Sequence, residues 1–305
     1  MQIGLSMVVK NEQQRLDTCL SGIHDLFDEI VVVDTGSTDA TVDILRKTYG
    51  AQVISVEPPK DDPYVITDAR NVSLKNNQAD WILVLDADEC ISREDVQTIR
   101  NAVSDGPDAY FVTWRNTRGS SVFDDYKLAL FKNGLGLSFE GLVHSNPQRS
   151  ARRAGIEAVS LPGVAIRHCL SHPNAGRTAR QARLERYVAA YPNWWRYQWF
   201  LGYTHYCNGD FESAVPLLRD TCNSLCPDFP VECLNAHFVL ADINARKGIK
   251  DKCSRIMRQA VSFYDAFRDD FEVRVNQSML PWMEKAIDAI DRDNLQEVRS
   301  YEFAY

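Results

Sequence analysis

Two apolar runs in the first ninety residues each end abruptly in carboxylates. Residues 30–34 read Ile-Val-Val-Val-Asp, and residues 81–89 read Trp-Ile-Leu-Val-Leu-Asp-Ala-Asp-Glu. Continuous runs of β-branched and aliphatic residues are typical of strands that are buried on both faces of a parallel sheet. Acidic residues at the carboxyl end of such a strand lie in the crevice where open α/β sheets bind ligands. The pattern therefore predicts a ligand site at the carboxyl ends of these strands.

The first hundred residues alternate between predicted strands and predicted helices. Strands are expected over residues 3–9, 29–33, 52–56 and 81–85, and helices over residues 12–26, 39–49 and 67–76. The second helix is predicted to begin at Ser37-Thr38-Asp39, whose side chains can accept from its free amide hydrogens, and to stop at Gly50. Strand–helix alternation of this kind indicates βαβ units and a parallel sheet.

From Tyr110 the pattern changes, and a domain boundary is predicted further on. Shorter strands are expected over residues 110–115 and 128–132, followed by an irregular, glycine-rich region that reaches His168. Residues 171–176 have the composition of a linker, and helical patterns dominate after it. We therefore expect an α/β domain over residues 1–170 and an all-α domain over residues 171–305.

The helical half contains a weak internal repeat. Leu201-Gly202, Gly209-Asp210-Phe211 and Ala214 fall at the spacings of a tetratricopeptide unit, in which small residues let paired helices approach. Leu240-Ala241, Gly248 and Ala260 form a second, similar register. The two glycines of the turns are 39 residues apart, whereas the usual period is 34. A tetratricopeptide-like domain is expected, and an unrelated helical bundle is the alternative.

Composition excludes several classes of protein. Of the 305 residues, 45% are hydrophobic and 25% are charged, as in a globular protein. A net charge of −8 argues against nucleic acid as a partner, because that binding needs clustered cations. There is no apolar run of about 20 residues to span a bilayer. The N-terminus has no basic region or cleavage site of a signal peptide. We therefore expect a cytoplasmic protein with reduced cysteines.

Five of the eight cysteines lie in the helical half. Cys222 and Cys226, followed by Cys233 and His237, loosely imitate the spacing of zinc ligands. The usual Cys-x2-Cys pair is missing, and cysteine is a small hydrophobic residue that is common inside helices. Buried thiols are the favoured interpretation, and zinc binding stays open.

The second acidic strand end predicts a metal. Asp86 and Asp88 are two carboxylates one residue apart just after a strand, and they can hold a hard divalent cation. Mg²⁺ or Mn²⁺ bound in this way keeps several waters and shares the phosphates of a substrate. The chemistry that this motif indicates is the handling of a diphosphate-bearing substrate through a metal.

Four segments in fixed order resemble the family 2 glycosyltransferases with the GT-A fold, over about residues 1–145. They are Ser6-Met7-Val8-Val9-Lys10-Asn11-Glu12, the stretch 31–39, Asp68-Ala69-Arg70-Asn71 and the stretch 80–89. The resemblance implies a nucleotide-diphospho-sugar transferase fold, which has a Rossmann-like, mostly parallel sheet. It also implies a nucleotide-sugar donor, probed most directly with UDP-sugars, and Mn²⁺ or Mg²⁺ as the cofactor.

The same resemblance assigns roles to individual residues. The nucleotide pocket would be lined by Val9, Asn11, Glu12 and Asp34, the diphosphate would lie by Asp68 and Arg70, and Asp86, Ala87 and Asp88 would match the Asp-x-Asp motif that binds donor and metal. Two alternatives remain open. Asp34 can instead cap its own turn, and Asp68 and Arg70 can belong to a surface ion pair.

A further stretch resembles lipopolysaccharide-core glucosyltransferases and bacteriocin peptide S-glycosyltransferases. It comprises residues 130–133 and 139–144 and ends in His144, which would be a third metal ligand unless its role is structural. Glutamate often follows this histidine in that pattern, but here the residue is Ser145. The catalytic base is therefore open between Glu140 and two aspartates of the preceding loop, Asp124 and Asp125.

These observations favour a metal-dependent, inverting glycosyltransferase whose helical half presents the acceptor or mediates a homodimer. A peptide or protein side chain is the favoured acceptor. The first alternative is a saccharide-extending enzyme for lipopolysaccharide or a lipid-linked glycan, with arginines near the domain junction in peripheral contact with an anionic membrane. The second is a non-catalytic helical-repeat adaptor with a degenerate GT-A domain.

Overall fold

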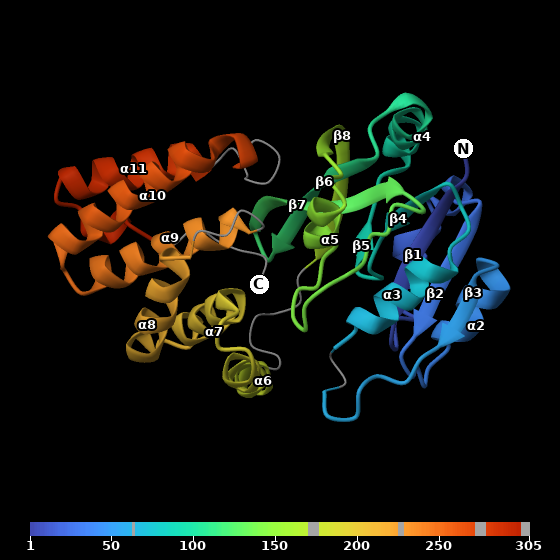
Figure 1. Ribbon diagram of the computed structural model, residues 1–305, viewed down its shortest axis with the longest axis horizontal. Helices are drawn as coiled ribbons and strands as arrows, with labels where there is room; N and C mark the ends of the chain where they lie inside the picture. Colours follow the sequence, from blue (N-terminus) through green and yellow to red (C-terminus); the bar gives the residue numbers. More distant parts are fainter. Residues whose placement is uncertain (63–64, 170–176, 225–228, 272–278, 300–305) are drawn as a thin grey trace. The chain divides into compact units, whose positions relative to one another are not determined.

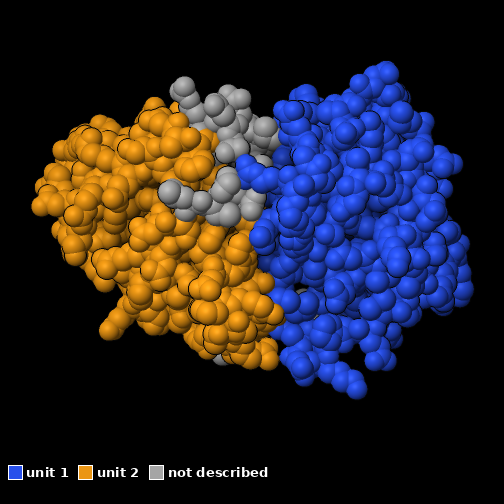
Figure 2. Space-filling model, viewed as in Figure 1, with its two compact units in different colours: residues 1–170 blue, residues 171–305 orange. Residues whose placement is uncertain are grey.

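The computed structural model describes residues 1–62, 65–169, 177–224, 229–271 and 279–299 (Figure 1). The chain divides into two compact units, Met1–Leu170 and Ser171–Tyr305, which are coloured separately in Figure 2. The linker predicted over residues 171–176 lies outside the described residues. The first unit is built around a sheet, and the described residues of the second unit are helical.

The first unit contains an eight-stranded mixed sheet in the order β3-β2-β1-β4-β7-β6-β8-β5 (Figure 1). Its strands are β1 (Ile3–Val9), β2 (Glu29–Asp34), β3 (Gln52–Ser55), β4 (Trp81–Val84), β5 (Glu89–Cys90), β6 (Ala109–Arg118), β7 (Ser121–Lys132) and β8 (Ala158–Cys169). Strands β1 to β4 are parallel to one another, and β7 pairs antiparallel with β4 and β6. Strand β8 is parallel to β6, and the short β5 pairs antiparallel with β8.

The helices of this unit cover both faces of the sheet. They are α1 (Leu16–Leu20), α2 (Thr41–Thr48), α3 (Thr67–Asn76), α4 (Val96–Asp105) and α5 (Gln148–Arg153), with short 3-10 turns η1 (His24–Leu26) and η2 (Arg93–Asp95). Alternate residues of β1, such as Leu5 and Met7, share a core with Leu16 and Leu20 of α1. Ser6 points to the other face, where its hydroxyl lies 2.7 Å from that of Ser73 in α3. Burial on both faces explains why these strands have continuous apolar sequences.

Two of the predicted segments that differ from the structure are the helix over residues 12–26 and the irregular region before His168. The helix expected over residues 12–26 is confined to α1 and η1, with a turn at Gly22 between them, although its apolar residues are buried. The region expected to be irregular before His168 contains the twelve-residue strand β8. Its pairing with β6 jumps from Leu161 to Ala165, and Gly163 between them has φ +79°. This bulge interrupts the two-residue periodicity that would otherwise reveal a strand.

The second unit consists of helical hairpins. Its elements are α6 (Arg177–Ala190), α7 (Trp195–Cys207), α8 (Phe211–Cys222), α9 (Pro230–Arg246), α10 (Lys250–Phe271), α11 (Met279–Asp291) and the 3-10 turn η3 (Leu295–Glu297). Gly209 and Gly248, both with positive φ, form the turns between α7 and α8 and between α9 and α10. A Cβ on Gly202 of α7 would lie 3.1 Å from Leu218 of α8, so this small residue permits the close approach of the two helices. Over the described residues, no helix combines the length and the apolarity that crossing a membrane requires.

A tight contact under β1 gives a prediction for stability. A Cβ on Gly4 would lie 2.1 Å from Oδ1 of Asn77, whose buried side chain donates to the carbonyl of Leu5. We expect Gly4→Ala to lower the free energy of unfolding by about 1–3 kcal/mol through overpacking, as measured by urea denaturation. Gly22→Ala is the control, because no atom lies within 4 Å of its added Cβ. Equal stability of the two variants would contradict this account.

Candidate active site

A tight acidic turn follows β4 and leads directly into β5. The backbone N–H of Asp86 donates to Oε2 of Glu89 over 2.8 Å, and the N–H of Glu89 donates back to the carbonyl of Asp86 over 3.0 Å. Ala87, between the two aspartates, is buried. The turn therefore holds Asp86, Asp88 and Glu89 in defined positions at the carboxyl end of a central strand.

Two cations hold the Asp86 carboxylate. Nη2 of Arg70 lies 2.7 and 2.9 Å from its two oxygens, and Nζ of Lys127 lies 3.5 Å from Oδ2. Arg70 comes from α3, and its guanidinium also lies 5.3 Å from the centre of the Phe139 ring. Burial raises the pKa of Asp86, but Arg70 and Lys127 lower it by more, so the net pKa lies well below the ordinary value. Asp86 is therefore a fixed anion.

Glu89 is the buried member of this charged cluster. It is 1% exposed, and its Oε2 accepts from Nζ of Lys127 over 2.6 Å. Burial, with a smaller contribution from the nearby Asp86, raises the pKa of Glu89 although Lys127 opposes this. The pKa of Lys127 is raised as well, because Asp86 and Glu89 outweigh the effect of its burial. Neither Lys127 nor Glu89 was predicted to act at the site, although Glu89 ends the acidic run at 86–89.

Asp88 faces a histidine from the far part of the sheet. Nε2 of His168, near the end of β8, lies 3.4 Å from Oδ2 of Asp88. The pairing of β5 with β8 places Glu89 opposite His168, which brings the acidic turn and the histidine together. The imidazole stacks on Trp114 with 5.0 Å between ring centres and 11° between planes. His168 was not predicted as a site residue. Recognition of strand β8 would have indicated it, because His168 lies near the carboxyl end of that strand.

Asp124 and Asp125 are not in a loop, as predicted, but in strand β7. The carboxylate of Asp124 accepts from Nε and Nη2 of Arg115 over 2.9 and 2.8 Å, on one face of the sheet. Asp125 is directly opposite Trp114 in the antiparallel pair, so both side chains share the other face, as does Lys127 two residues later. Because Lys127 contacts Asp86, Asp125 lies on the face of the acidic turn.

Glu140 and His144 lie in the segment between β7 and α5. The carboxylate of Glu140 accepts from Nη1 of Arg153 over 3.1 Å, and its backbone pairs with Asn146. His144 has φ +46°, and its carbonyl accepts from the side chain of Asn146. Across the described residues, no group of three or more His, Cys, Asp or Glu side chains is arranged to hold a metal. Binding of a metal by Asp86, Asp88 and His144 stays a prediction.

The loops after β1 and β2 are held together by side chains that were predicted to bind nucleotide. The carboxylate of Asp34 is 5% exposed and accepts from the backbone N–H groups of Gly36 and Ser37 over 3.1–3.2 Å. Asn11 has φ +57°, and its Oδ1 accepts from the N–H of Thr38 over 2.7 Å. For Asp34, this is the turn-capping alternative that the sequence left open.

The remaining predicted residues of the nucleotide pocket have varied surroundings. The carbonyl of Val9 accepts from the N–H and the hydroxyl of Thr35. Glu12 forms an ion pair of 2.9 Å with Arg15. Asp68 is exposed in the first turn of α3. Among the predicted donor residues, Arg70 and Asp86 form an ion pair, and Val9 and Asp34 are neighbours in the pairing of β1 with β2.

Three buried polar atoms around the acidic turn have no hydrogen-bond partner within the described part of the chain. They are Nε of Arg70, Oε1 of Glu89 and Nε1 of Trp114. Buried polar groups in folded proteins almost always have partners, either in the protein or in bound water and ligands. Three such atoms in one region indicate a site that is completed by a polar ligand or by water.

The cysteine-rich stretch of the helical unit contains the candidate zinc ligands. Cys226 lies outside the described residues. Burial raises the pKa of the Cys222 thiol, and Sγ of Cys233 lies 3.1 Å from the carbonyl of Ser224. Nδ1 of His237 contacts the carbonyl of Cys233 over 2.7 Å. The described members of the stretch therefore have the surroundings of buried helix residues.

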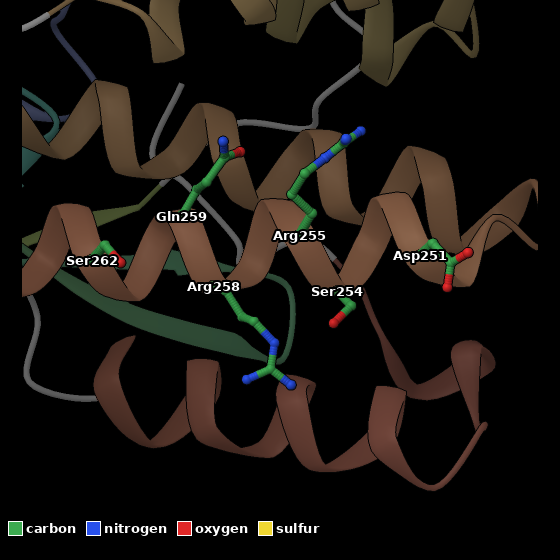
Figure 3. Close-up of a pocket in the computed structure, with 6 residues that line it drawn as sticks. All are labelled: Asp251, Ser254, Arg255, Arg258, Gln259 and Ser262. Atoms are coloured by element: carbon green, nitrogen blue, oxygen red, sulfur yellow. The ribbon is translucent and has the colours of Figure 1, made fainter.

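A polar cavity of about 420 Å³ lies along α10 in the helical unit. It is lined by Asp251, Ser254, Arg255, Arg258, Gln259 and Ser262, whose side chains project from one helix (Figure 3). Arg258 points toward α11, where Asp291 lies 3.6 Å away. The lining carries both an anion, Asp251, and two arginines, of which Arg258 is within ion-pair distance of Asp291.

Comparison with protein families identifies the first unit. Residues 5–159 match the model of glycosyl transferase family 2, which is just over half of the chain. The chain therefore belongs to glycosyl transferase family 2. The family, the α/β fold of the first unit and the all-helical second part agree with the expectations from the sequence.

Individual relatives match just under half of this chain. Glycosyltransferase SunS of Bacillus subtilis is 37% identical over 149 residues, which are 48% of this chain and 34% of SunS. A TPR repeat-containing protein of Synechococcus elongatus is 33% identical over 145 residues, which are 47% of this chain and 34% of that protein. The match therefore spans about a third of the length of these curated relatives. Among solved structures, S. aureus TarS 1–349 in complex with UDP-GlcNAc aligns with 98% of this chain and 90% of its own, at 14% identity and a TM-score of 0.48.

The lowered pKa of Asp86 predicts a pH-dependent loss of stability in Asp86→Asn. A carboxylate with a lowered folded-state pKa contributes stability above its unfolded pKa of about 4 and loses that contribution as the pH falls. Removing the charge also leaves Arg70 and Lys127 facing no anion at this position. We expect the variant to lose about 2–3 kcal/mol at pH 7, less than for a fully buried pair because 29% of the side chain is exposed.

The difference between wild type and Asp86→Asn should shrink when urea unfolding is repeated near pH 3.5. Asp43→Asn is the matched control, because Asp43 pairs with Lys47 on an exposed helix surface. It should show no measurable loss at either pH. A loss in Asp86→Asn that is independent of pH would refute the assigned role of its charge.

Proposed function

We propose that this protein transfers a sugar from a nucleotide-sugar donor to an acceptor, with inversion at the anomeric carbon. The observation that carries the proposal is the difference in surroundings between the two aspartates that follow β4. Asp86 is neutralised by Arg70 and Lys127, whereas Asp88 faces His168 and keeps 35% of its side chain exposed. UDP-sugars are the first donors to test.

In this proposal the donor diphosphate lies over the acidic turn, near Arg70 and Lys127. Oδ2 of Asp88 and Nε2 of His168 are 3.4 Å apart, and oxygen and imidazole nitrogen are both ligands of divalent metals. We therefore propose Asp88 and His168 as the protein ligands of Mn²⁺ or Mg²⁺. When bound, such a cation supplies Lewis-acid stabilisation of the departing nucleoside diphosphate.

The nucleoside would lie at the carboxyl ends of β1 and β2. Family membership supports this position, and the loops there are held in place by hydrogen bonds such as that between Asn11 and Thr38. The backbone at Val9, together with Glu12, Asp34 and Asp68, stays the proposed lining of this pocket. The carboxylate of Asp34 accepts hydrogen bonds from two backbone N–H groups. Because a carboxylate can accept more than two, Asp34 can also accept from a ribose hydroxyl or a base N–H.

For the base we propose Asp125 ahead of Glu140 and Asp124. The carboxylate of Asp124 lies on the opposite face of β7, where Arg115 donates to it. Asp125 shares the sheet face of Lys127 and Trp114, which is the face of the acidic turn. In the reaction, the carboxylate takes the proton from the acceptor while the acceptor atom bonds to the anomeric carbon and the bond to the diphosphate oxygen breaks.

A peptide or protein side chain is the proposed acceptor, modified in the cytoplasm. Stacked helical hairpins offer extended surfaces that bind peptides, and the second unit consists of such hairpins. The cavity along α10 adds two arginines, Arg255 and Arg258, that suit acidic or polar side chains of an acceptor. A thiol acceptor would need a weaker base than a hydroxyl, because the thiolate forms more readily.

Donor hydrolysis tests the proposal most directly. Purified protein incubated with a panel of UDP-sugars and Mn²⁺ should release UDP, and a chelator should stop the release. We expect Asp88→Ala to lower this rate at least about 100-fold, as for the loss of a major electrostatic stabiliser, with an unchanged circular-dichroism spectrum. Asp43→Ala, an exposed carboxylate on α2, is the control. Neither turnover nor nucleotide binding with any donor would refute the proposed function.

Substitution of neighbouring aspartates tests the base. Asp125→Asn should lower the rate of transfer to an acceptor by about 10²- to 10⁴-fold, the usual contribution of general-base catalysis, while donor affinity is retained. Asp124→Asn is the matched control, because its carboxylate lies on the opposite face of β7 with Arg115. If Glu140→Gln abolishes transfer and Asp125→Asn does not, Glu140 is the base.

A further inference from the structure

Asn116 in β6 is fully buried and has two partners that determine how its amide is oriented. Its Nδ2 donates to the carbonyl of Trp114 over 2.9 Å, and its Oδ1 lies 2.8 Å from Nδ1 of His168. Turning the amide over would place Oδ1 against the carbonyl oxygen of Trp114. Two oxygens without a hydrogen between them repel each other, so the observed orientation is the one that the surroundings allow.

This orientation determines which nitrogen of His168 carries the hydrogen. Because an amide oxygen can only accept, Nδ1 must donate to Asn116. In the neutral imidazole the lone pair is then on Nε2, the nitrogen that lies 3.4 Å from Oδ2 of Asp88. Stacking on Trp114 at 11° between the ring planes also restricts rotation of the ring. The lone pair is therefore held on the ring nitrogen that lies beside the carboxylate of Asp88.

Nε2 of His168 and Oδ2 of Asp88 are close enough together to bind one cation. Metal-bound histidines usually donate through their other nitrogen to an oxygen, which fixes the tautomer and the direction of the metal-binding nitrogen. We propose that Asn116 is a positioning residue that holds His168 in the Nδ1–H tautomer, so that Nε2 and Asp88 bind one divalent cation together. The proposal rests on the proposed function in one respect, namely that this cation serves the donor diphosphate.

The tautomer can be read in the wild-type protein without any activity. Long-range ¹H–¹⁵N correlation spectra of the full chain labelled with ¹⁵N-histidine, with His168→Gln to assign the signal, distinguish the two nitrogens. Without metal, the neutral form of His168 should have its hydrogen on Nδ1. Addition of Mn²⁺ should broaden the Nε2 signal first. A hydrogen on Nε2 in the neutral form would overturn the proposal.

Metal affinity gives the second test. Asn116→Leu should raise the Kd for Mn²⁺, measured by electron paramagnetic resonance of free Mn²⁺, about 10- to 100-fold, which is the usual effect of losing such a partner. Asn116→Asp keeps an oxygen opposite Nδ1 and should restore affinity to near the wild-type value. Asn101→Leu is the control, because the exposed Asn101 bonds only to Gln97 among the described contacts.

The outcomes separate this inference from the proposed function. If the wild type turns over donors but Asn116→Leu keeps both the Nδ1–H tautomer and the wild-type Kd, the role of Asn116 is refuted and the proposed function stands. If no donor is used while the tautomer and the Kd respond as expected, the proposed function fails and the positioning role stands. If Asn116→Leu does not fold, the wild-type tautomer and the Asn116→Asp variant still decide.

Discussion

The first unit depends on the compensation of buried charge beside the acidic turn. Asp86 and Glu89 are held by Arg70 and Lys127; Glu89 is buried, and the other three side chains are partly buried. An ionised group in such surroundings costs several kcal/mol unless opposite charges and hydrogen bonds compensate it. The cations come from α3 and β7, which are far apart in the chain. The ion pairs of the acidic turn therefore require that α3 packs against β1 and β2 and that β7 pairs with β4.

This compensation gives two similar aspartates different roles. Asp86 has its charge balanced within the protein, so it stabilises the turn and has little need of an added cation. Asp88 projects from the same turn toward His168 and is more exposed. The contrast in surroundings is the basis for proposing a structural role for Asp86 and a ligand-binding role for Asp88. It also explains why Lys127, which no motif indicated, belongs to the site.

Much of the fold was predictable, because burial on both faces leaves a continuous apolar run in the sequence. Strands β1, β2 and β4 and helix α3 agree closely with the segments expected from that pattern. Strand β8 was missed because the bulge at Gly163 interrupts its alternation. His168 was missed with it. The loop expected at Asp124 and Asp125 is a strand, since its charged residues alternate between the two faces of the sheet rather than marking a turn.

The sequence alone determined that acidic residues follow a central buried strand, that strands and helices alternate before a helical half, and that the chain belongs with family 2 glycosyltransferases. These properties are local: they depend on runs and spacings of neighbouring residues. Only the tertiary structure decided which cation meets which carboxylate and that His168 lies beside Asp88. Those outcomes depend on the packing of α3 against β1 and β2 and on the pairing of β4 with β7 and of β5 with β8. Such pairings bring together residues up to about 80 positions apart, and the local pattern carries no record of them.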